Sequence, residues 1–276
     1  MKRLFAALLS LTLLAGAAAA AEPAAPAAKA APKSHTAASS FTPAPSGWYA
    51  EFRGGVATQD LPDLDANIAY WEGLGVQFLN SPGDLHRFSQ APTFTLEGGL
   101  RRGTLSYGLE TQWQRQVVDN FTAGTFSGSI DMTSLFSVID ARATVTARPA
   151  KLYGFEVGAS AGWAFAHCSE RYTLSVYSAP QDNVTINGIY DANAPSLGAH
   201  LGWRRPLVGS TWLLARAAWS WRDFGEMTGK EDIASGGVSY AYLTDLRRFD
   251  NGEKAQVNGS GFQFTVGLSY TLGGKR

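Results

Sequence analysis

Acidic and basic side chains recur at alternate positions in several short segments of this sequence. Glu51 and Arg53 are two residues apart, as are Asp140 and Arg142. In an extended chain such residues share a face, where opposite charges can pair or line a path for ions. If that face is enclosed, the charges must pair, because an unpaired buried charge costs several kcal/mol or more. The predicted network comprises Glu51, Arg53, Glu97, Glu110, Asp140, Arg142, Glu156 and Arg216.

A second candidate for chemistry is the run of residues 167–170, His-Cys-Ser-Glu. His167 and Ser169 share a face of an extended chain, and a histidine that activates a serine hydroxyl is the minimum for acyl transfer. The candidate catalytic residues are therefore His167, Ser169 and Glu170, although so short a match also arises by coincidence. Cys168 is the only cysteine, which excludes an intramolecular disulfide and a zinc cluster. No metal-ligand cluster or phosphate-binding loop is present in the sequence, so no cofactor is predicted.

The elements that carry these residues are predicted to be β-strands. In residues 262–272 large apolar residues alternate with polar residues and glycine, which gives a strand one apolar and one polar face. Seven further segments show this alternation: 47–56, 93–102, 105–114, 135–147, 152–165, 196–204 and 211–222. The pattern predicts an all-β fold with eight strands.

Short and long connections alternate strictly between these strands. The short ones are residues 102–104, 148–151 and 205–210, and the long ones are 57–92, 115–133, 166–195 and 223–260. A transmembrane barrel of the bacterial outer membrane has short periplasmic turns and long external loops, whereas a soluble sandwich has no reason to sort its connections. The interior of an eight-stranded barrel is only wide enough for its own side chains. A plug of paired charges is therefore favoured over a gated ion path.

The aromatic residues of the apolar faces gather near the strand ends. Aromatic rings favour the headgroup level of a membrane, so two girdles are expected around a barrel. The predicted girdle residues are Trp48, Trp113, Tyr153, Trp163, Trp203, Trp219, Trp221 and Tyr270.

The two ends of the chain differ from the barrel in composition. Residues 1–21 are typical of a secretory signal, with Lys2 and Arg3 before an apolar run and small residues at the cleavage site. Residues 22–46 are rich in Ala and Pro and predict a disordered periplasmic tether. The barrel is expected over 47–272, followed by a short basic tail at 273–276. Removing Lys2 and Arg3 leaves 21 basic residues against 23 acidic ones, which does not favour nucleic-acid binding.

Segments 47–52 (Gly-Trp-Tyr-Ala-Glu-Phe) and 266–272 (Val-Gly-Leu-Ser-Tyr-Thr-Leu) resemble those of small outer-membrane barrels of Gram-negative bacteria, the OmpA-type, OmpX-type and opacity-type group. The resemblance implies a transmembrane antiparallel up-and-down β-barrel in the cell outer membrane, with its N-terminus in the periplasm. It also implies an interior charge network that fills the barrel. The expected partners are outer-membrane lipid, lipopolysaccharide and the barrel-assembly machinery.

The four long connections carry net charges of −4, −1, −2 and −3 in chain order. An acidic surface of this kind can attract divalent cations or a cationic extracellular partner, or can simply keep exposed loops solvated. Within the third connection, residues 172–177 and 184–189 predict two short strands. They could form a hairpin above the membrane whose exposed edge binds a partner by strand addition. They could equally be two more spanning strands, which would make ten.

The sequence therefore favours a non-enzymatic outer-membrane barrel that displays long acidic loops at the cell surface, in surface interaction or envelope integrity. One alternative is a narrow ion-conducting porin. The other is an outer-membrane lipid A acyl hydrolase that uses His167 and Ser169, whose His-x-Ser spacing is similar to that of the lipid A deacylases.

Overall fold

The computed structural model describes residues 46–59, 61–79, 85–123, 128–149 and 154–272. The predicted signal, almost all of the tether, the basic tail and Tyr153 lie outside these residues. The elements of the barrel wall are β1 (Gly47–Thr58), β2 (Gln90–Arg102), β3 (Leu105–Ala123), β4 (Gly128–Ala147), β5 (Phe155–Val176), β6 (Val184–Pro206), β7 (Thr211–Glu226) and β11 (Gly261–Leu272). They match the predicted strands and confirm the all-β fold class.

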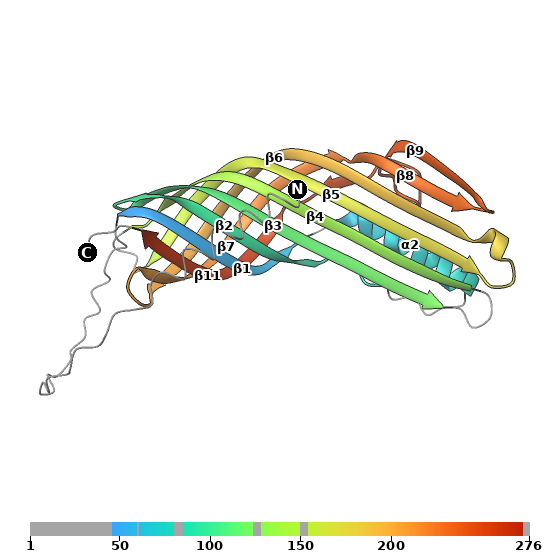
Figure 1. The fold of residues 1–276 in the computed structure, drawn as a ribbon, viewed down its shortest axis with the longest axis horizontal. Helices are drawn as coiled ribbons and strands as arrows, with labels where there is room; N and C mark the ends of the chain where they lie inside the picture. The colour runs from blue at the N-terminus through green and yellow to red at the C-terminus, as the bar shows by residue number, and fades with distance from the viewer. Residues whose placement is uncertain (1–45, 60, 80–84, 124–127, 150–153, 273–276) are drawn as a thin grey trace, which may run out of the picture. The chain divides into compact units, whose positions relative to one another are not determined.

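These strands form a closed ring (Figure 1). Each strand pairs antiparallel with the next from β1 to β7, and β11 closes the ring by pairing with both β7 and β1. The short connections lie together at one end of the ring, which we call the turn end. Gly103 and Gly209 have positive φ values of 57° and 58° in two of these turns, a conformation that costs glycine little.

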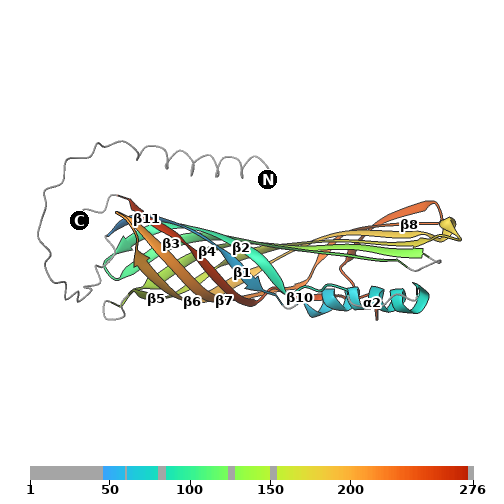
Figure 2. The same ribbon diagram turned by 90° about the horizontal axis from the view of Figure 1, so that it is seen from below.

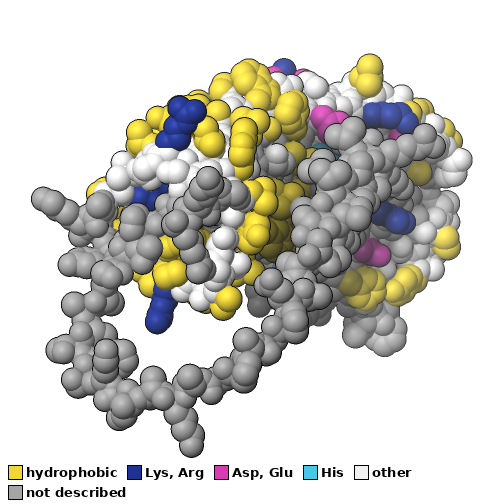
Figure 3. Space-filling model, turned by 60° about the vertical axis from the view of Figure 1, so that its left-hand side comes forward, with side chains coloured by type: hydrophobic (Ala, Val, Ile, Leu, Met, Phe, Trp, Pro, Cys, Tyr) yellow, Lys and Arg dark blue, Asp and Glu magenta, His cyan; other side chains and the backbone are white. Residues whose placement is uncertain are grey.

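The barrel wall has a polar inner face and an apolar outer face. Along β1 the residues Glu51 and Arg53 are buried, whereas Trp48, Phe52 and Val56 are more than half exposed. Figure 3 shows many hydrophobic side chains on the outer surface of the protein. Because the ring has no free edge and its exposed surface is apolar, it satisfies its backbone hydrogen bonds internally, as a structure surrounded by lipid must.

Four wall strands continue well beyond the others. The extended parts of β3 (116–123), β4 (128–137), β5 (166–176) and β6 (184–194) stay paired with one another. Beyond the barrel, β6 changes its partner from β7 to β8 (Thr228–Ser235), and β8 pairs with β9 (Val238–Asp245). These six strand segments form an open sheet above the barrel, which we call the upper sheet (Figure 2).

The segments predicted as a separate hairpin, 172–177 and 184–189, belong almost entirely to these extended ends of β5 and β6. The short helix η2 (Pro180–Asp182) joins the two strands. They therefore lie above the barrel, and the ring contains eight strands, not ten.

Helix α2 (Pro62–Leu79) lies along the upper sheet (Figure 2) and was missed by the sequence prediction, which assigned residues 57–92 to a long connection. Its buried residues Leu64, Ile68 and Trp71, with Leu61 just before it, nevertheless have helical spacing. Pro62 stands at the first helical position, and the first turn is acidic, which suits the positive end of the helix dipole. Among the described residues no helix has the length and hydropathy needed to cross a membrane.

An apolar core, which we call the upper core, fills the space between α2, the upper sheet and the short strand β10 (Gln256–Asn258). Its buried members include Leu61, Leu64, Ile68, Trp71, Phe88, Val118, Ile130, Met132, Phe136, Cys168, Tyr172, Tyr190, Phe224, Met227, Leu246 and Val257. Most of the residues assigned to long loops are therefore folded around a core of their own.

Candidate functional site: a paired-charge barrel interior below a folded surface module

Arg216 of β7 lies at the centre of the charges inside the barrel. Its Nη1 lies 2.9 Å from an oxygen of Glu97 and 3.4 Å from one of Glu110, while its Nη2 lies 3.0 Å from Glu156 and 3.5 Å from Glu51. Four different strands supply these carboxylates, so one guanidinium links β1, β2, β3 and β5 to β7. The planar fork of arginine suits this role because it offers five N–H donors in fixed directions.

Two further arginines share the same carboxylates. Arg53 pairs with Glu51 at 3.4 Å, with Glu97 at 3.0 Å and with Glu110. Arg142 pairs with Glu110 at 2.7 Å and lies 3.6 Å from Asp140. The structure thus brings together all eight residues of the predicted interior network, and each is at most 5% exposed.

The structure adds residues to this network that the prediction left out. Arg204 pairs with Glu51 at 2.8 Å and with Glu156 at 3.0 Å, and Arg148 pairs with Glu156 at 3.1 Å. The hydroxyl of Tyr49 donates to Glu97 at 2.7 Å. Arg204 and Tyr49 stand on the polar faces of predicted strands. Their positions near the strand ends did not indicate that their side chains reach the carboxylates in the middle of the barrel. Arg148 comes just after the predicted strand 135–147, so alternation did not assign it to the interior.

Glycines make room for these long side chains. A Cβ on Gly198 would lie 2.8 Å from Nη1 of Arg142, and one on Gly202 would lie 2.8 Å from Oε1 of Glu156. His200, whose Nε2 is 3.1 Å from Oγ1 of Thr146, occupies the space beside Gly158. The glycine-rich polar faces thus leave room for long side chains in the barrel interior.

The remaining space inside this part of the barrel is small. A hollow of about 10 Å³ lies among Glu110, Arg142, His200 and Arg216, which is about the minimum for one water molecule. The charges are therefore held in contact with one another instead of bordering an aqueous channel at this level.

The predicted girdle residues lie on the outer surface of the wall, except that Tyr153 is not described. Trp48 and Tyr270 are exposed near the turn end, and Trp163, Trp219 and Trp221 are exposed at the opposite rim. Trp113 stacks on its cross-strand neighbour Phe94 with ring centroids 5.7 Å apart. Trp203 is half-buried beside Phe155. These positions bound a band of apolar side chains between two aromatic levels.

The three candidate catalytic residues are not brought together. Glu170 is buried on the inner face of β5, whereas His167 and Ser169 lie on the outer face. The structure instead places Asp191 of β6 beside His167, with Nδ1 2.8 Å from Oδ1. Glu170 is therefore not the acid that orients His167. Asp191 was missed because its partner lies on a neighbouring strand and not nearby in sequence.

Glu170 belongs to the upper core. It is 3% exposed, and one of its oxygens, Oε1, has no hydrogen-bond partner among the described residues. Burial raises the pKa of its carboxyl to about 7, and hydrogen bonds from Tyr172 and Asn67 partly offset this shift. Asn67 also ties α2 to the segment before β10, because it donates to the carbonyl of Arg247 and accepts from the N–H of Phe249.

No protein-family model and no curated protein matches the chain. Among solved structures, the outer membrane protease OmpT from Escherichia coli is similar at 13% identity, with 85% of this chain and 99% of that chain covered and a TM-score of 0.45. A major outer membrane protein from Thermus thermophilus is similar at 11% identity, 82% and 99% coverage and a TM-score of 0.45. Neisserial surface protein A is similar at 10% identity, 82% and 98% coverage and a TM-score of 0.35.

The assignment of this chain rests on the physical features of its own architecture. A closed antiparallel ring with an apolar outer band, two aromatic levels and charges paired inside has the expected features of a barrel that crosses the outer membrane. The chain is therefore an outer-membrane β-barrel, as its resemblance to the small Gram-negative barrels predicted.

Proposed function

We propose that this protein is a non-enzymatic outer-membrane barrel that anchors a folded module at the cell surface, in surface interaction or envelope integrity. The observation that carries the proposal is the contrast between a barrel filled by paired charges and the six strand segments and helix built above it. The turn end then faces the periplasm, and the upper sheet faces the medium. What the sequence presents as four acidic loops is largely this folded module.

The packed interior favours an anchor over a narrow porin. Conduction through the barrel requires Arg216 to separate from four carboxylates at once, which leaves several buried charges unpaired. Purified, folded protein in planar bilayers is expected to show no conductance steps. Regular single-channel steps from such a sample would overturn the proposal of a closed anchor.

The surface role has its own test. Cells that lack the protein are compared with cells that carry the full-length chain, and with cells that carry a chain in which a short Gly-Ser linker replaces β8 and β9. A surface role predicts that loss of the whole protein and loss of these strands change detergent sensitivity or adhesion in the same way. Equal behaviour of all three strains would contradict it.

One observation favours a second candidate, an acyl hydrolase acting at the membrane surface. His167 and Ser169 share the outer face of β5 just above Phe165 of the aromatic rim, and Asp191 contacts Nδ1 of His167. A carboxylate at Nδ1 holds the imidazole so that Nε2 can take a proton from a serine hydroxyl. Ser169 would attack an ester carbonyl, His167 would return the proton to the departing alcohol, and water would then release the acyl group.

Lipid A mass spectra test this candidate. Strains carrying the wild type, Ser169→Ala, Asp191→Asn and an empty vector are compared. Hydrolysis predicts a lipid A species that lacks one acyl chain in the wild type alone. Identical spectra in all four strains would dispose of the hydrolase.

A further inference from the structure

The upper sheet has two edges, and one of them is protected. At the β3 edge, Asn120 accepts from the backbone N–H of His86 at 2.7 Å and donates to its carbonyl at 3.0 Å. The segment before β2 is thereby held against the inner face of β3 at this edge, and Asp119 adds a charge to the strand. Covering segments and charges of this kind prevent other chains from pairing with an edge strand.

The opposite edge is β9, and it has no such protection. β9 ends the sheet order, so among the described residues no strand pairs with its far side. From Val238 to Thr244 the strand carries no charged residue and no proline. Tyr240 is 60% exposed and Leu243 is 87% exposed. A strand with these properties presents its free N–H and C=O groups as a template for another extended chain.

The side chains of β9 give such a chain something to pack against. Val238, Tyr240 and Tyr242 share one face of the strand, and Ile233 of β8 lies directly opposite Tyr240. Helix α2 contacts β3, β4 and β10, whereas Tyr240 and Val238 stay at least half exposed. An added strand that places β-branched or aromatic side chains beside these tyrosines would extend the apolar face through favourable cross-strand pairs.

The charge of the β8–β9 hairpin indicates what kind of chain fits. Residues 228–245 contain Lys230 against Glu231, Asp232 and Asp245, a net charge of −2. The carboxylate of Glu231 accepts hydrogen bonds from Tyr190 and Tyr242, at 2.9 Å each, and it has no cationic partner within the described residues. A peptide with an uncharged centre and basic ends therefore complements this hairpin, whereas an acidic one is repelled.

A second copy of this protein fits less well. Two identical hairpins would bring net charges of −2 together. Antiparallel pairing of two identical strands also requires a two-fold axis perpendicular to them, and strands in such barrels tilt only about 35–45° from the barrel axis. That operation turns the second barrel away from the membrane of the first.

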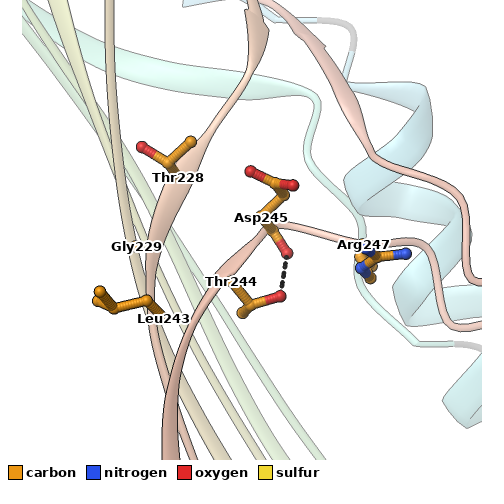
Figure 4. Close-up of a pocket in the computed structure, with 6 residues that line it drawn as sticks. All are labelled: Thr228, Gly229, Leu243, Thr244, Asp245 and Arg247. Carbon is orange, nitrogen blue, oxygen red and sulfur yellow. Dashed lines mark hydrogen bonds between the residues drawn. The ribbon is translucent and has the colours of Figure 1, made fainter.

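A hollow of about 480 Å³ lies at the barrel-side end of β9 (Figure 4). Its lining residues are Thr228, Gly229, Leu243, Thr244, Asp245 and Arg247. Asp245 is ion-paired with Lys254 at 3.1 Å, while Arg247 donates to the carbonyl of Gly252 at 2.8 Å. The hollow lies against both strands of the hairpin and has room for a large side chain of a bound strand.

We propose that the free edge of β9, residues 238–244, binds an extended segment of a partner protein as an added strand, with an uncharged centre and basic ends. This site differs from the predicted one on segments 172–177 and 184–189. Those segments lie between β4 and β8, so neither of them has a free edge.

The test uses the full-length protein in detergent micelles and a fluorescent, end-capped peptide, Lys-Val-Thr-Tyr-Thr-Val-Thr-Val-Lys. Two further versions of this peptide are N-methylated on alternate residues. One version blocks the backbone N–H groups along one edge of the extended peptide, and the other version blocks those along the opposite edge. Strand addition predicts saturable binding of the parent, a loss of about tenfold or more for one methylated version and little change for the other. Equal binding of all three, or no binding up to about 1 mM, would overturn the proposal.

Variants then locate the site. Ala241→Lys puts a charge on the edge strand, and Ala234→Lys puts the same charge on the same face of β8, one strand further in. Ala241→Lys is expected to weaken peptide binding about tenfold, with Ala234→Lys within about twofold of wild type. Equal effects of the two variants would place the peptide elsewhere. A wild-type dimer that Ala241→Lys dissociates in sedimentation equilibrium would replace the peptide with a second copy as the occupant.

Discussion

The inner faces of the barrel and of the upper sheet are built from the same strands but are stabilised by different interactions. On β5, Glu156 lies in the barrel and pairs with Arg148, Arg204 and Arg216. Glu170, fourteen positions further along the same strand, lies among apolar side chains without a cation partner in the described structure. The inward direction of a strand residue is set by alternation, but its electrostatic environment is set by whichever strands or helices lie opposite.

The two regions therefore have different weaknesses. The barrel interior depends on every charge keeping its partner, since removing one partner leaves others buried and unpaired. The upper core depends on apolar contact between α2 and the sheet, since few of its members can form a hydrogen bond. Four substitutions test this difference between the two regions.

The largest effect is expected from Arg216→Met. It leaves Glu51, Glu97, Glu110 and Glu156 with one cation fewer, and breaking such a buried set costs about 3–5 kcal/mol or more. The urea midpoint of the folded, heat-modifiable band should fall sharply. Arg205→Met, an exposed arginine on β6 near the turn end, is the matched control and should leave the midpoint unchanged. Equal midpoints for both variants would mean that the interior pairs contribute little.

Trp71→Ala should weaken the upper core alone. Trp71 is 4% exposed and stacks on Tyr172 with ring centroids 5.2 Å apart, so its removal should cost about 3 kcal/mol. Limited proteolysis should cut within α2 or the adjoining segments while heat-modifiable migration is retained. Val76→Ala, at an exposed position of the same helix, is the control. Loss of the folded barrel band in the Trp71 variant would show that the two regions unfold together.

Glu170 should make the upper core sensitive to pH. Burial raises the pKa of its carboxyl in the folded protein to about 7, above the ordinary value of 4.5. Its contribution to stability is therefore fully present below about pH 4.5 and is lost as the pH rises through about 7, on the order of 3 kcal/mol in total.

The measurement is protease resistance of α2 at about pH 5 and about pH 8, compared between wild type and Glu170→Gln. The wild type should lose resistance at the higher pH, and the glutamine variant should lose less. A wild-type change in the opposite direction would refute the assignment of this carboxyl.

Lys230→Met should have the smallest effect. Its ammonium group lies 3.0 Å from Asp232, but the two side chains are 58% and 43% exposed. Exposed pairs of this kind contribute about 0.2–1 kcal/mol, so the change in unfolding free energy should stay at or below that range. A loss comparable to that of Arg216→Met would mean that exposure does not separate weak pairs from strong ones in this protein.

Alternation in the sequence was sufficient to predict the strands and their two faces. The strict sorting of short and long connections then decided that the apolar faces turn outward and the polar faces inward. Alternation also identified the interior charges, because Glu97 and Arg216 each stand on the polar face of their predicted strand. It could not predict how Arg216 reaches four carboxylates, because the closure of β11 on β1 and β7 decides which strands face one another.

The upper sheet and its helix show where that reasoning failed. Residues 116–123 were assigned to a long connection, and residues 184–189 were predicted as a short strand within another one, separate from the wall strand that they continue. The inner faces of these segments carry Val118 and Tyr190, which do not continue the polar alternation of the barrel interior. Helix α2 was missed although Leu64, Ile68 and Trp71 have helical spacing. These three residues lie within the stretch 57–92, which had been assigned to a long connection.

The order of residues along the chain is enough to specify the strands, the apolar outer band and the set of charges that must be enclosed, because these depend on near neighbours in sequence. The fold as a whole sets the rest. Among the described residues, Glu156 has arginine partners and Glu170 has none, Asp191 lies beside His167, and β9 has no strand on its far side. Each of these depends on contacts between residues far apart in the chain, and the energy of a buried charge or an open edge is set by those contacts.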